Sequence, residues 1–243
     1  MTAVSIVIPM KNESGNVEAV LGEIAQACDG LTEYEIIVVD DGSTDDTAAK
    51  VKSLMARHPT LRLLQHPTSA GQSAGVHSGT LAAHGRIICT LDGDGQNPPS
   101  ELPKLFTPLL EDQTGRLGLV AGQRVGRQDT LSKKLASRFA NGLRARILKD
   151  GTRDTGCGLK GFRRDAFLAF PYFDHMHRYL PALAKRDGWE VALVDVAHRE
   201  RHAGRSNYSN FQRALVGIYD LIGVAWLIRR RKKAQPVEAG ADV

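Results

Sequence analysis

The sequence has 243 residues, 42% of them hydrophobic and 24% charged, which is ordinary for a globular protein of one large domain or two small ones. Only 6% are aromatic and they do not alternate with the cations, which argues against a protein that stacks nucleic-acid bases. Residues 1–122 carry 8 Lys and Arg against 15 Asp and Glu (net −7), whereas residues 123–243 carry 24 against 12 (net +12). This division is typical of a metal site beside a surface that binds anions such as phosphates, acidic lipids or nucleic acid.

Cysteine usage and the N-terminal segment indicate the compartment. Cys28, Cys89 and Cys157 are far apart, odd in number and without the spacing of metal ligands, which indicates a reducing, cytosolic environment. Residues Val4–Pro9 are apolar but too few for a signal peptide, and a first strand explains them better. We therefore expect a cytoplasmic protein.

The first half of the chain predicts strands that alternate with helices. Short apolar, β-branched runs predict strands at residues 4–8, 35–39, 61–65, 87–91 and 117–121. Helices are expected at 14–28 with Ser14 as the cap, at 70–83, which is rich in small residues, and near 100–111. The alternation implies right-handed crossovers and an open, mostly parallel α/β sheet with helices on both faces.

Acidic or polar turns follow three of these strands, at the edge where an open parallel sheet binds its ligands. They are Pro9–Glu13, Asp40–Asp46 and Asp92–Gln96. Acidic turns also begin many helices, so each turn alone has an ordinary structural explanation. Three of them on one edge favour a shared binding site.

The segment Arg86–Pro99 is the most informative of these. Asp92 and Asp94 directly follow a strand that is typical of one buried on both faces, and Gly93 and Gly95 let the chain turn. Two carboxylates one residue apart point the same way in extended backbone, so both can face a single ion. Oxygen ligands suit Mg²⁺ or Mn²⁺ bound to a diphosphate. The alternative is a plain Asp-Gly turn between a strand and a helix.

The second half is basic and less regular. Apolar residues recur every four positions from 131 to 147, which predicts an amphipathic helix within residues 123–149. The elements expected after it are a turn at 154–158, a strand at 159–162, a helix at 176–187, a strand at 190–197 and a loop at 198–208 that is rich in Arg and His.

The C-terminal segment predicts a helix at a membrane surface. Residues Phe211–Ile228 are the most apolar stretch, but polar and charged residues interrupt it, and a spanning helix needs about twenty mainly apolar residues. Trp226 near its end and the five cations at 229–233 favour an amphipathic helix on an anionic membrane surface. The alternative is a helix packed on the domain with a solvated basic tail. Residues 234–243 are expected to be disordered.

These motifs, in their order, resemble the inverting glycosyltransferases of family two, and within them the dolichol-phosphate mannose synthase and polyprenyl-phosphate glycosyltransferase group. The residues that carry the resemblance are Val7-Ile8-Pro9 with Asn12-Glu13, Val38 to Asp45, Leu91 to Gln96 with Pro98, Gly122-Gln123-Arg124, Ser137-Arg138, and Arg201 with Gly204 and Ser206. The resemblance covers residues 4–208 and implies the GT-A fold, an open, mostly parallel Rossmann-like sheet. It also implies a catalytic domain at 1–208, an apolar helix with a basic membrane-proximal segment at 209–233, and a tail at 234–243.

The resemblance implies roles for particular side chains. The residues that would bind the base and ribose of the nucleotide are Pro9, Glu13 and Asp41. Those that would bind the metal and the donor diphosphate are Asp92, Asp94 and Gln96, with Asp94 counted as catalytic. Those that would contact the phosphates of acceptor and donor are Arg124, Arg138 and Arg201.

Two positions depart from the family pattern. Lys11 stands where an aromatic residue is often found, and Asn207 stands where relatives commonly have a Lys after Gly-x-Ser. The missing Lys bears on the identity of the donor and on the binding of its phosphates. Relatives often carry transmembrane helices after the catalytic domain, and no segment here qualifies, so the sequence resembles the shorter, membrane-associated members.

We therefore expect metal-dependent, inverting transfer of a hexose from a GDP-mannose or UDP-glucose type of donor to a polyprenyl or dolichyl phosphate. The expected cofactor is Mg²⁺ or Mn²⁺, and the expected place is the cytoplasmic face of a membrane, with a membrane protein or a second copy of the chain as a further partner. One alternative is transfer to a hydroxyl of a saccharide or glycolipid, for which Asp154 would be the base unless it only caps its turn. Another is a nucleotide-binding, membrane-docked module without catalysis.

Overall fold

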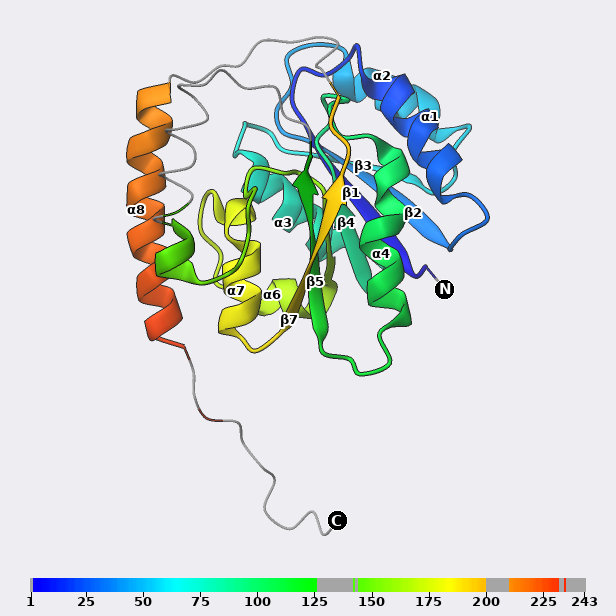
Figure 1. Cartoon of the computed structure of the whole chain (residues 1–243). Helices are drawn as coiled ribbons and strands as arrows, with labels where there is room; N and C mark the ends of the chain where they lie inside the picture. Colours follow the sequence, from blue (N-terminus) through cyan, green and yellow to red (C-terminus); the bar gives the residue numbers. More distant parts are fainter. Residues whose placement is uncertain (1, 126–141, 143, 200–209, 232–233, 235–243) are drawn as a thin grey trace.

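The computed structural model describes residues 2–125, 142, 144–199, 210–231 and 234, with the backbone alone described at 210–215. These residues form a seven-stranded sheet with the order β3-β2-β1-β4-β6-β5-β7 (Figure 1). The strands are β1 Val4–Met10, β2 Tyr34–Asp40, β3 Leu61–Gln65, β4 Ile87–Thr90, β5 Leu117–Arg124, β6 Lys160–Arg163 and β7 Glu190–Val196. The α-helices are α1 Val17–Cys28, α2 Thr47–Met55, α3 Gln72–Ala82, α4 Leu102–Glu111, α6 Arg164–Ala169, α7 Leu180–Arg186 and α8 Asn210–Arg229, and the 3₁₀ turns are η1 Pro99–Glu101 and η2 Met176–Arg178.

The sheet is mostly parallel, as the sequence predicts. β1 pairs in parallel with β2 and β4, β2 pairs in parallel with β3, and β5 pairs in parallel with β7. The exception is β6, which lies antiparallel between β4 and β5. Because of this direction, the first residue of β6 lies at the same edge as the last residues of its two neighbours.

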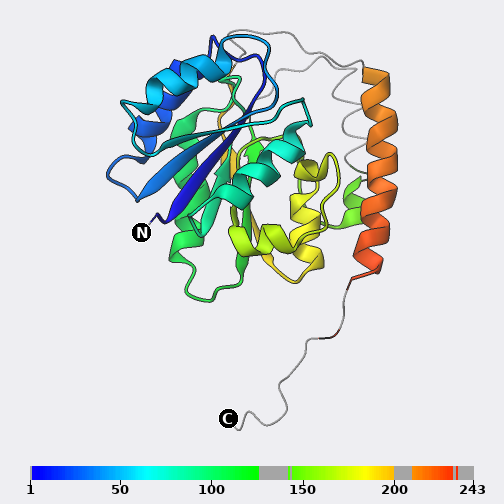
Figure 2. The ribbon, with the colours of Figure 1, turned by 180° about the vertical axis from the view of Figure 1, so that it is seen from behind.

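Helices cover both faces of the sheet, as expected (Figures 1 and 2). On one face, apolar residues of α1, α2 and α4 pack against alternate residues of the central strands, with Phe106 among the largest. On the other face, α3, α6 and α7 bury a second cluster around Phe162 and Phe167, whose rings stack with their centroids 4.7 Å apart. The central strands are therefore apolar on both sides, which explains their continuous apolar runs.

Helix α3 lies directly on β1 because its inward positions are glycines. A Cβ at Gly75 would lie 2.9 Å from Pro9 Cβ, and one at Gly79 would overlap Val7 and lie 3.2 Å from Val39 Cγ2. The small residues that lower the helix propensity of this segment thus let its backbone approach the sheet closely. This approach brings the start of α3 to the carboxyl edge.

Helix α8 packs on α7 with one side and exposes the other. Val224 is buried with Tyr179 and Leu148 in a third small cluster, and Arg186 Nε donates to the Leu227 carbonyl at 3.0 Å. The exposed large apolar side chains of α8 are Val216, Ile218, Tyr219, Ile222 and Trp226. Of the helices in the described ranges, none has the length and apolar character needed to cross a membrane.

Three expectations need correction. The helix expected within 123–149 does not begin at Gln123, because β5 continues through Arg124 in register with β7, and only 142 and 144–148 are described as helical. Ser14 does not cap α1, which begins at Val17, and the Ser14 backbone N–H donates to Asp45 Oδ2 at 3.2 Å instead. The helix expected at 176–187 is divided into η2 and α7.

Candidate active site

The loops that follow β1, β2 and β4 lie together, as the sequence predicts. Asn12 joins the first two, since its backbone N–H donates to Ser43 Oγ at 2.9 Å and its Oδ1 accepts from Thr44 N at 2.8 Å. Its φ of 55° is left-handed, a conformation that Asn tolerates better than most residues. The third loop meets the end of β1 at Gly93, where a Cβ would lie 2.6 Å from Met10 Cγ.

Asp92 and Asp94 form the acidic part of this edge. Burial raises the pKa of Asp92, and the negative charge of Asp94 raises it further, while Lys160 and Asn97 oppose the rise. Asp94 is 8% exposed, and its Oδ1 accepts a hydrogen bond from the Gln96 backbone N–H at 3.1 Å. Asp92 is half-buried and Asp94 is buried, so the negative charge of one acts on the other, and a cation beside them would favour their charged forms.

These residues fit a divalent cation with oxygen ligands. In the described ranges, no group of three or more His, Cys, Asp and Glu side chains could hold a metal. Mg²⁺ commonly binds one or two carboxylates together with substrate phosphates and waters, so Asp92 and Asp94 with Gln96 are a sufficient protein contribution. Asn97, which is 1% exposed, supports this fit, because its Oδ1 has no hydrogen-bond partner within the described part of the chain.

Side-chain amides hold both oxygens of Asp92. Gln72 Nε2, at the start of α3, donates to Oδ1 at 2.6 Å, and Asn97 Nδ2 donates to Oδ2 at 2.9 Å. Gly158 limits a further side, since a Cβ there would lie 2.5 Å from Asp92 Cγ. Sequence reasoning missed all three residues: Gln72 and Gly158 are remote in sequence, and only the position of Asn97 beside the aspartates could have indicated it.

Arg124, the last residue of β5, forms a two-point ion pair with Asp154. Its Nε donates to Oδ2 at 2.5 Å and its Nη2 donates to Oδ1 at 2.9 Å. Gln123 Oε1 fixes the Asp154 loop by accepting from the backbone N–H groups of Arg153 and Asp154 at 2.8 and 3.0 Å. Burial raises the pKa of Asp92. The positive charges of nearby cations, Arg124 among them, lower it. The structure therefore brings Arg124 and Asp154 to the aspartate site.

Lys160 is a buried cation at this edge. The sequence predicted that it lies in a strand but gave it no functional role. It is 4% exposed, and its Nζ donates to the Cys157 carbonyl. Burial lowers the pKa of Lys160, whereas Cys157, Asp92 and Asp154 raise it. The antiparallel direction of β6 explains its place, because Lys160 pairs with Thr90 at the end of β4.

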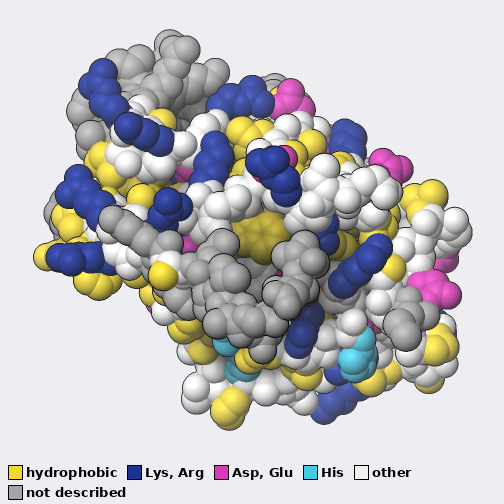
Figure 3. Space-filling model, turned by 90° about the horizontal axis from the view of Figure 1, so that it is seen from below, with side chains coloured by type: hydrophobic (Ala, Val, Ile, Leu, Met, Phe, Trp, Pro, Cys, Tyr) yellow, Lys and Arg dark blue, Asp and Glu magenta, His cyan; other side chains and the backbone are white. Residues whose placement is uncertain are grey.

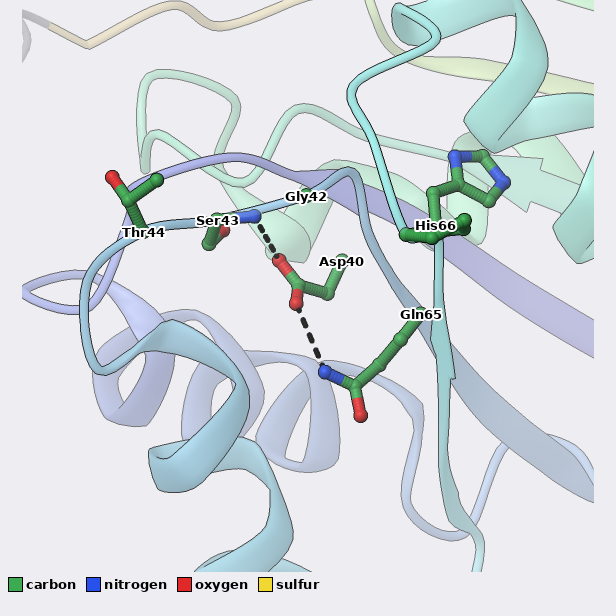
Figure 4. Close-up of a pocket in the computed structure, with 7 residues that line it drawn as sticks. Asp40, Gly42, Ser43, Thr44, Gln65 and His66 are labelled. Atoms are coloured by element: carbon green, nitrogen blue, oxygen red, sulfur yellow. Dashed lines mark hydrogen bonds between the residues drawn. The ribbon is translucent and has the colours of Figure 1, made fainter.

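A polar pocket of about 550 Å³ opens at the carboxyl ends of β2 and β3. Its lining is Asp40, Gly42, Ser43, Thr44, Gln65, His66 and Pro67 (Figure 4). Asp40 accepts hydrogen bonds from Ser43 N at 3.1 Å and Gln65 Nε2 at 3.3 Å, which Figure 4 marks as dashed lines. Small-molecule sites commonly measure about 300 to 1,000 Å³, so the pocket can receive a nucleobase.

Asp41, next to this pocket, accepts four hydrogen bonds from the segment that leads into α3. The donors are His66 Nδ1 at 2.8 Å, Ser69 Oγ at 2.7 Å, Ala70 N at 2.8 Å and Gly71 N at 2.9 Å. Burial opposes ionisation, but these bonds outweigh it and lower the pKa of Asp41 to about 2. The Asp41 carboxylate thus anchors residues 66–71, and the acid that lines the pocket is Asp40, which sequence reasoning did not single out.

Pro9 and Glu13 also lie at this edge, as expected. Pro9 is in β1 beneath Gly75, and Glu13 Oε2 accepts a hydrogen bond from Asn16 Nδ2 at 2.6 Å. The Glu13 backbone N–H donates to Thr47 Oγ1 at 2.9 Å, which joins the loops after β1 and β2. The contacts expected between these residues and a nucleotide stay predictions.

Arg138 and Arg201 lie outside the described residues, so their expected roles also stay predictions. The last described residue before Arg201 is Arg199. Its backbone N–H donates to the Gln96 carbonyl at 2.9 Å, and its guanidinium pairs with Glu23 at 2.9 Å. The described segment 144–199 therefore ends against the loop that carries Asp92 and Asp94.

Known proteins with similar sequences agree with the resemblance. The family described as "Glycosyl transferase family 2" matches residues 5–169. The chain is 34% identical over 224 residues to an undecaprenyl-phosphate 4-deoxy-4-formamido-L-arabinose transferase of Photorhabdus laumondii, and 35% identical over 222 residues to the protein of that name from Yersinia pestis. Each match covers 90% of this chain and 66% of the relative, so the chain spans slightly less than two thirds of the relatives' length.

Solved structures with a similar fold include glucosyl-3-phosphoglycerate synthase from Mycobacterium tuberculosis. Its complex with Mn²⁺, UDP and glucosyl-3-phosphoglycerate has a TM-score of 0.68 and 22% identity, covering 94% of this chain and 80% of that chain. Its complex with Mg²⁺ and UDP has a TM-score of 0.68 and 21% identity, covering 94% and 79%. At this identity the likeness concerns the fold alone, and the expected GT-A fold is confirmed.

Proposed function

The chain belongs to glycosyl transferase family 2, and from this premise we propose that it transfers a hexose from a nucleoside-diphosphate sugar to a polyprenyl phosphate. The observation that carries the proposal is the pair Asp92 and Asp94 beside the Arg124–Asp154 ion pair at one sheet edge. Relatives named as undecaprenyl-phosphate sugar transferases support the class of acceptor. A structural neighbour bound to UDP supports a nucleoside diphosphate as the donor's leaving group.

We assign the donor to the loops after β1, β2 and β4. Asp92 and Asp94 with Gln96 would hold Mg²⁺ or Mn²⁺, which would neutralise the negative charge that develops on the departing diphosphate. The base would enter the pocket lined by Asp40, a carboxylate that accepts hydrogen bonds and therefore suits a base with a ring N–H. Around it, the base and ribose would lie near Pro9 at the end of β1 and Glu13 in the loop after it, and Asp41 would act through the segment 66–71 that its carboxylate holds.

Transfer to a lipid phosphate requires cations near the acceptor more than it requires a general base. The second ionisation of a phosphate monoester lies near about pH 6, so a lipid phosphate is mostly dianionic at neutral pH and its oxygen can attack without losing a proton. Arg124, whose Nε and Nη2 pair with Asp154, would contact this phosphate through Nη1, and Arg138 and Arg201 would add their planar guanidinium groups. These cations would reduce the repulsion between the phosphate and the diphosphate. Attack from the face opposite the diphosphate would invert the anomeric centre, so an α-linked donor would give a β-linked lipid phosphosugar.

The hydroxyl-acceptor alternative depends on Asp154 as a base. Both oxygens of Asp154 accept hydrogen bonds from Arg124, and Oδ1 also accepts one from Gly156 N at 3.1 Å. Hydrogen bonds to the charged form of a carboxylate favour that form and weaken it as a base. The arrangement therefore favours the phosphate acceptor.

We further propose that α8 lies on an anionic membrane and places the enzyme beside its lipid substrate. Ile222 and Trp226 of α8 are 64% and 58% exposed, and the cations Arg229–Arg231 follow. In Figure 3, Lys and Arg side chains lie among apolar ones on the side where Figure 1 places α8, and further Lys and Arg side chains lie across the rest of this face. Apolar side chains next to cations are typical of helices that lie in the headgroup region of a bilayer.

The test is a donor screen with the purified full chain, Mg²⁺, polyprenyl phosphate and labelled UDP- and GDP-sugars. We expect a labelled lipid phosphosugar, and we expect Asp94→Ala to reduce its formation by about a hundredfold or more while the circular dichroism spectrum is unchanged. Glu111→Ala, an exposed carboxylate at the end of α4, should have wild-type activity.

Three results would count against the proposal. Transfer to a saccharide hydroxyl that is lost in Asp154→Asn would establish the alternative acceptor. Binding of nucleotide and cation without product from any donor would indicate a module without catalysis. Full activity of Asp94→Ala would remove the metal assignment.

A further inference from the structure

The carboxylate of Asp92 is fixed by two neutral amides, Gln72 and Asn97, which none of the assignments above uses. They donate to Oδ1 at 2.6 Å and to Oδ2 at 2.9 Å, and they come from α3 and from the loop after β4. Because each oxygen of the carboxylate has its own donor, rotation about its terminal bond would break both hydrogen bonds. The amides therefore set the direction in which the remaining lone pairs of Asp92 point.

The neutrality of these donors matters for a cation site. A Lys or Arg that bonded directly to either oxygen would hold Asp92 equally well, but it would neutralise the carboxylate and repel a divalent ion more strongly than Lys160 and Arg124, which act on Asp92 without a direct hydrogen bond. An amide N–H fixes the carboxylate and leaves its negative charge available. Gly158 adds to the constraint, because a Cβ at this position would lie 2.5 Å from Asp92 Cγ and displace the carboxylate from its place between the amides.

Asn97 also has a side-chain oxygen, Oδ1, that no donor in the described part of the chain contacts. The side chain is 1% exposed, and its Oδ1 has no hydrogen-bond partner in the part of the chain that the structure describes. Turning the amide over would place Oδ1 against Asp92 Oδ2, two acceptors without a hydrogen between them, so the nitrogen must face the carboxylate. A buried amide oxygen without a donor destabilises the folded state, so the hydrogen bond from Nδ2 to Asp92 is what holds the side chain in this orientation.

We propose that Gln72 and Asn97 are positioning residues of the cation site: their amide nitrogens orient the Asp92 carboxylate toward the divalent cation. This inference rests on the proposed function only in requiring a divalent cation at Asp92 and Asp94. It adds two residues that act through Asp92, and it predicts that cation affinity depends on both.

The experiment measures Mn²⁺ binding directly, without sugar donor or lipid. Free Mn²⁺ is followed by electron paramagnetic resonance while the wild type and its variants are titrated with Mn²⁺ alone and with Mn²⁺ in the presence of UDP or GDP. Gln72→Met keeps the length of an exposed side chain and removes the donor, so we expect about a tenfold loss of Mn²⁺ affinity. Asn97→Leu removes the other donor, and we expect a loss of about 10- to 100-fold.

Matched controls separate positioning from folding. Gln113→Met replaces an exposed glutamine far in sequence from the site and should bind Mn²⁺ as the wild type does. Nucleotide binding without Mn²⁺ should be unchanged in Gln72→Met, because the variant alters the cation site alone. Since Asn97 is buried and its replacement can lower stability, Gln72→Met decides the question if Asn97→Leu does not fold.

The outcomes distinguish this inference from the proposed function. Wild-type Mn²⁺ affinity in Gln72→Met would overturn the positioning role. Sugar transfer by a wild-type protein that binds no Mn²⁺ would overturn this inference and leave the transfer reaction standing. Mn²⁺ binding that weakens in the variants, in a protein that transfers no sugar, would support the positioning role and reject the proposed function.

Discussion

Two adjacent acids at the end of β2 differ in what surrounds their carboxylates. Asp40 lines the polar pocket, where Gln65 and Ser43 each donate one hydrogen bond to it. Asp41 is 5% exposed and accepts four hydrogen bonds from residues 66–71. A carboxylate with four donors has little capacity left for a ligand, so Asp41 serves the site chiefly by holding the segment that leads into α3.

This difference predicts an acid-dependent contribution to stability. We expect Asp41→Asn to lower the free energy of unfolding by about 1.5 to 3 kcal/mol at neutral pH, because the amide loses charge-assisted bonds and its NH₂ faces backbone donors. The folded-state pKa of Asp41 is about 2, below its ordinary value of 3.8. Its contribution is therefore complete above the ordinary value and is lost as the pH falls toward the folded value.

Urea unfolding at a series of pH values checks this. The stability difference between wild type and Asp41→Asn should be constant near neutrality and should shrink as the pH falls from about 4 to about 2. Asp46→Asn, at an exposed position in the same turn, should change stability by less than about 0.5 kcal/mol. A difference that persists undiminished at the acid end would contradict the role assigned to Asp41.

At the scale of elements, α3 and β6 bring the site together. α3 rests on β1 through Gly75 and Gly79, which carries Gln72 to the Asp92 carboxylate. β6 runs antiparallel between β4 and β5, so Lys160 and Gly158 reach the same edge from the opposite chain direction. The local sequence of each element indicates a helix or a strand but not its position. The packing of the element in the fold places it at the site.

Close packing of α3 predicts a large effect from a single methyl group. Gly79→Ala should lower the free energy of unfolding by about 1 to 3 kcal/mol, since the added Cβ would overlap Val7 and the packed strand has no room to move. Gly22→Ala is the matched control, because Gly22 lies within α1 with no atom near its missing Cβ. That variant should gain about 0.5 to 1 kcal/mol from helix propensity. Equal effects of the two substitutions in thermal unfolding would refute the close packing.

At the scale of the whole molecule, charge and apolar surface are concentrated in different places. The acidic first half carries the aspartate edge of the sheet, and the basic second half supplies Arg124, Lys160 and the cations after α8. α8 shields one side of α7 and leaves large apolar side chains outside. A molecule arranged in this way can meet an anionic surface with α8 while the sheet edge receives the soluble donor.

Vesicle binding tests this orientation. Ile222→Glu should weaken sedimentation with phosphatidylglycerol-containing vesicles roughly five- to thirtyfold, which corresponds to about 1 to 2 kcal/mol for an apolar side chain kept out of the bilayer. Leu31→Glu adds the same charge at a side chain of similar exposure, 62% against 64%, on a distant loop and should bind as the wild type does. Binding should also fall with salt, since anionic lipid attracts the cations after α8. Equal binding of the two variants would exclude α8 as the contact.

Local pattern was sufficient to predict much of the fold. Strand runs such as Val4–Met10 and Tyr34–Asp40 are apolar because helices cover both faces, and this leaves a signal in consecutive residues. The acidic turns after them are also local, so the sequence predicted a ligand edge, and the order of its motifs predicted the family. The helix predicted within residues 123–149 was placed too early in the chain, because pairing of β5 with β7 keeps Gln123 and Arg124 in a strand.

The finer arrangement of the site depends on contacts between residues that are far apart in the chain. Gln72 and Asp92 are 20 positions apart, and Arg124 and Asp154 are 30 apart. The periodicity and spacing of the sequence do not indicate such partners, because these residues meet only after the crossovers and the antiparallel β6 have brought the strands into one sheet. The sequence by itself determined the seven strands, the acidic edge and the family, but it did not predict the helices α2 and α6. The tertiary structure decided which side chains face the pocket, which anchor a loop and which orient Asp92.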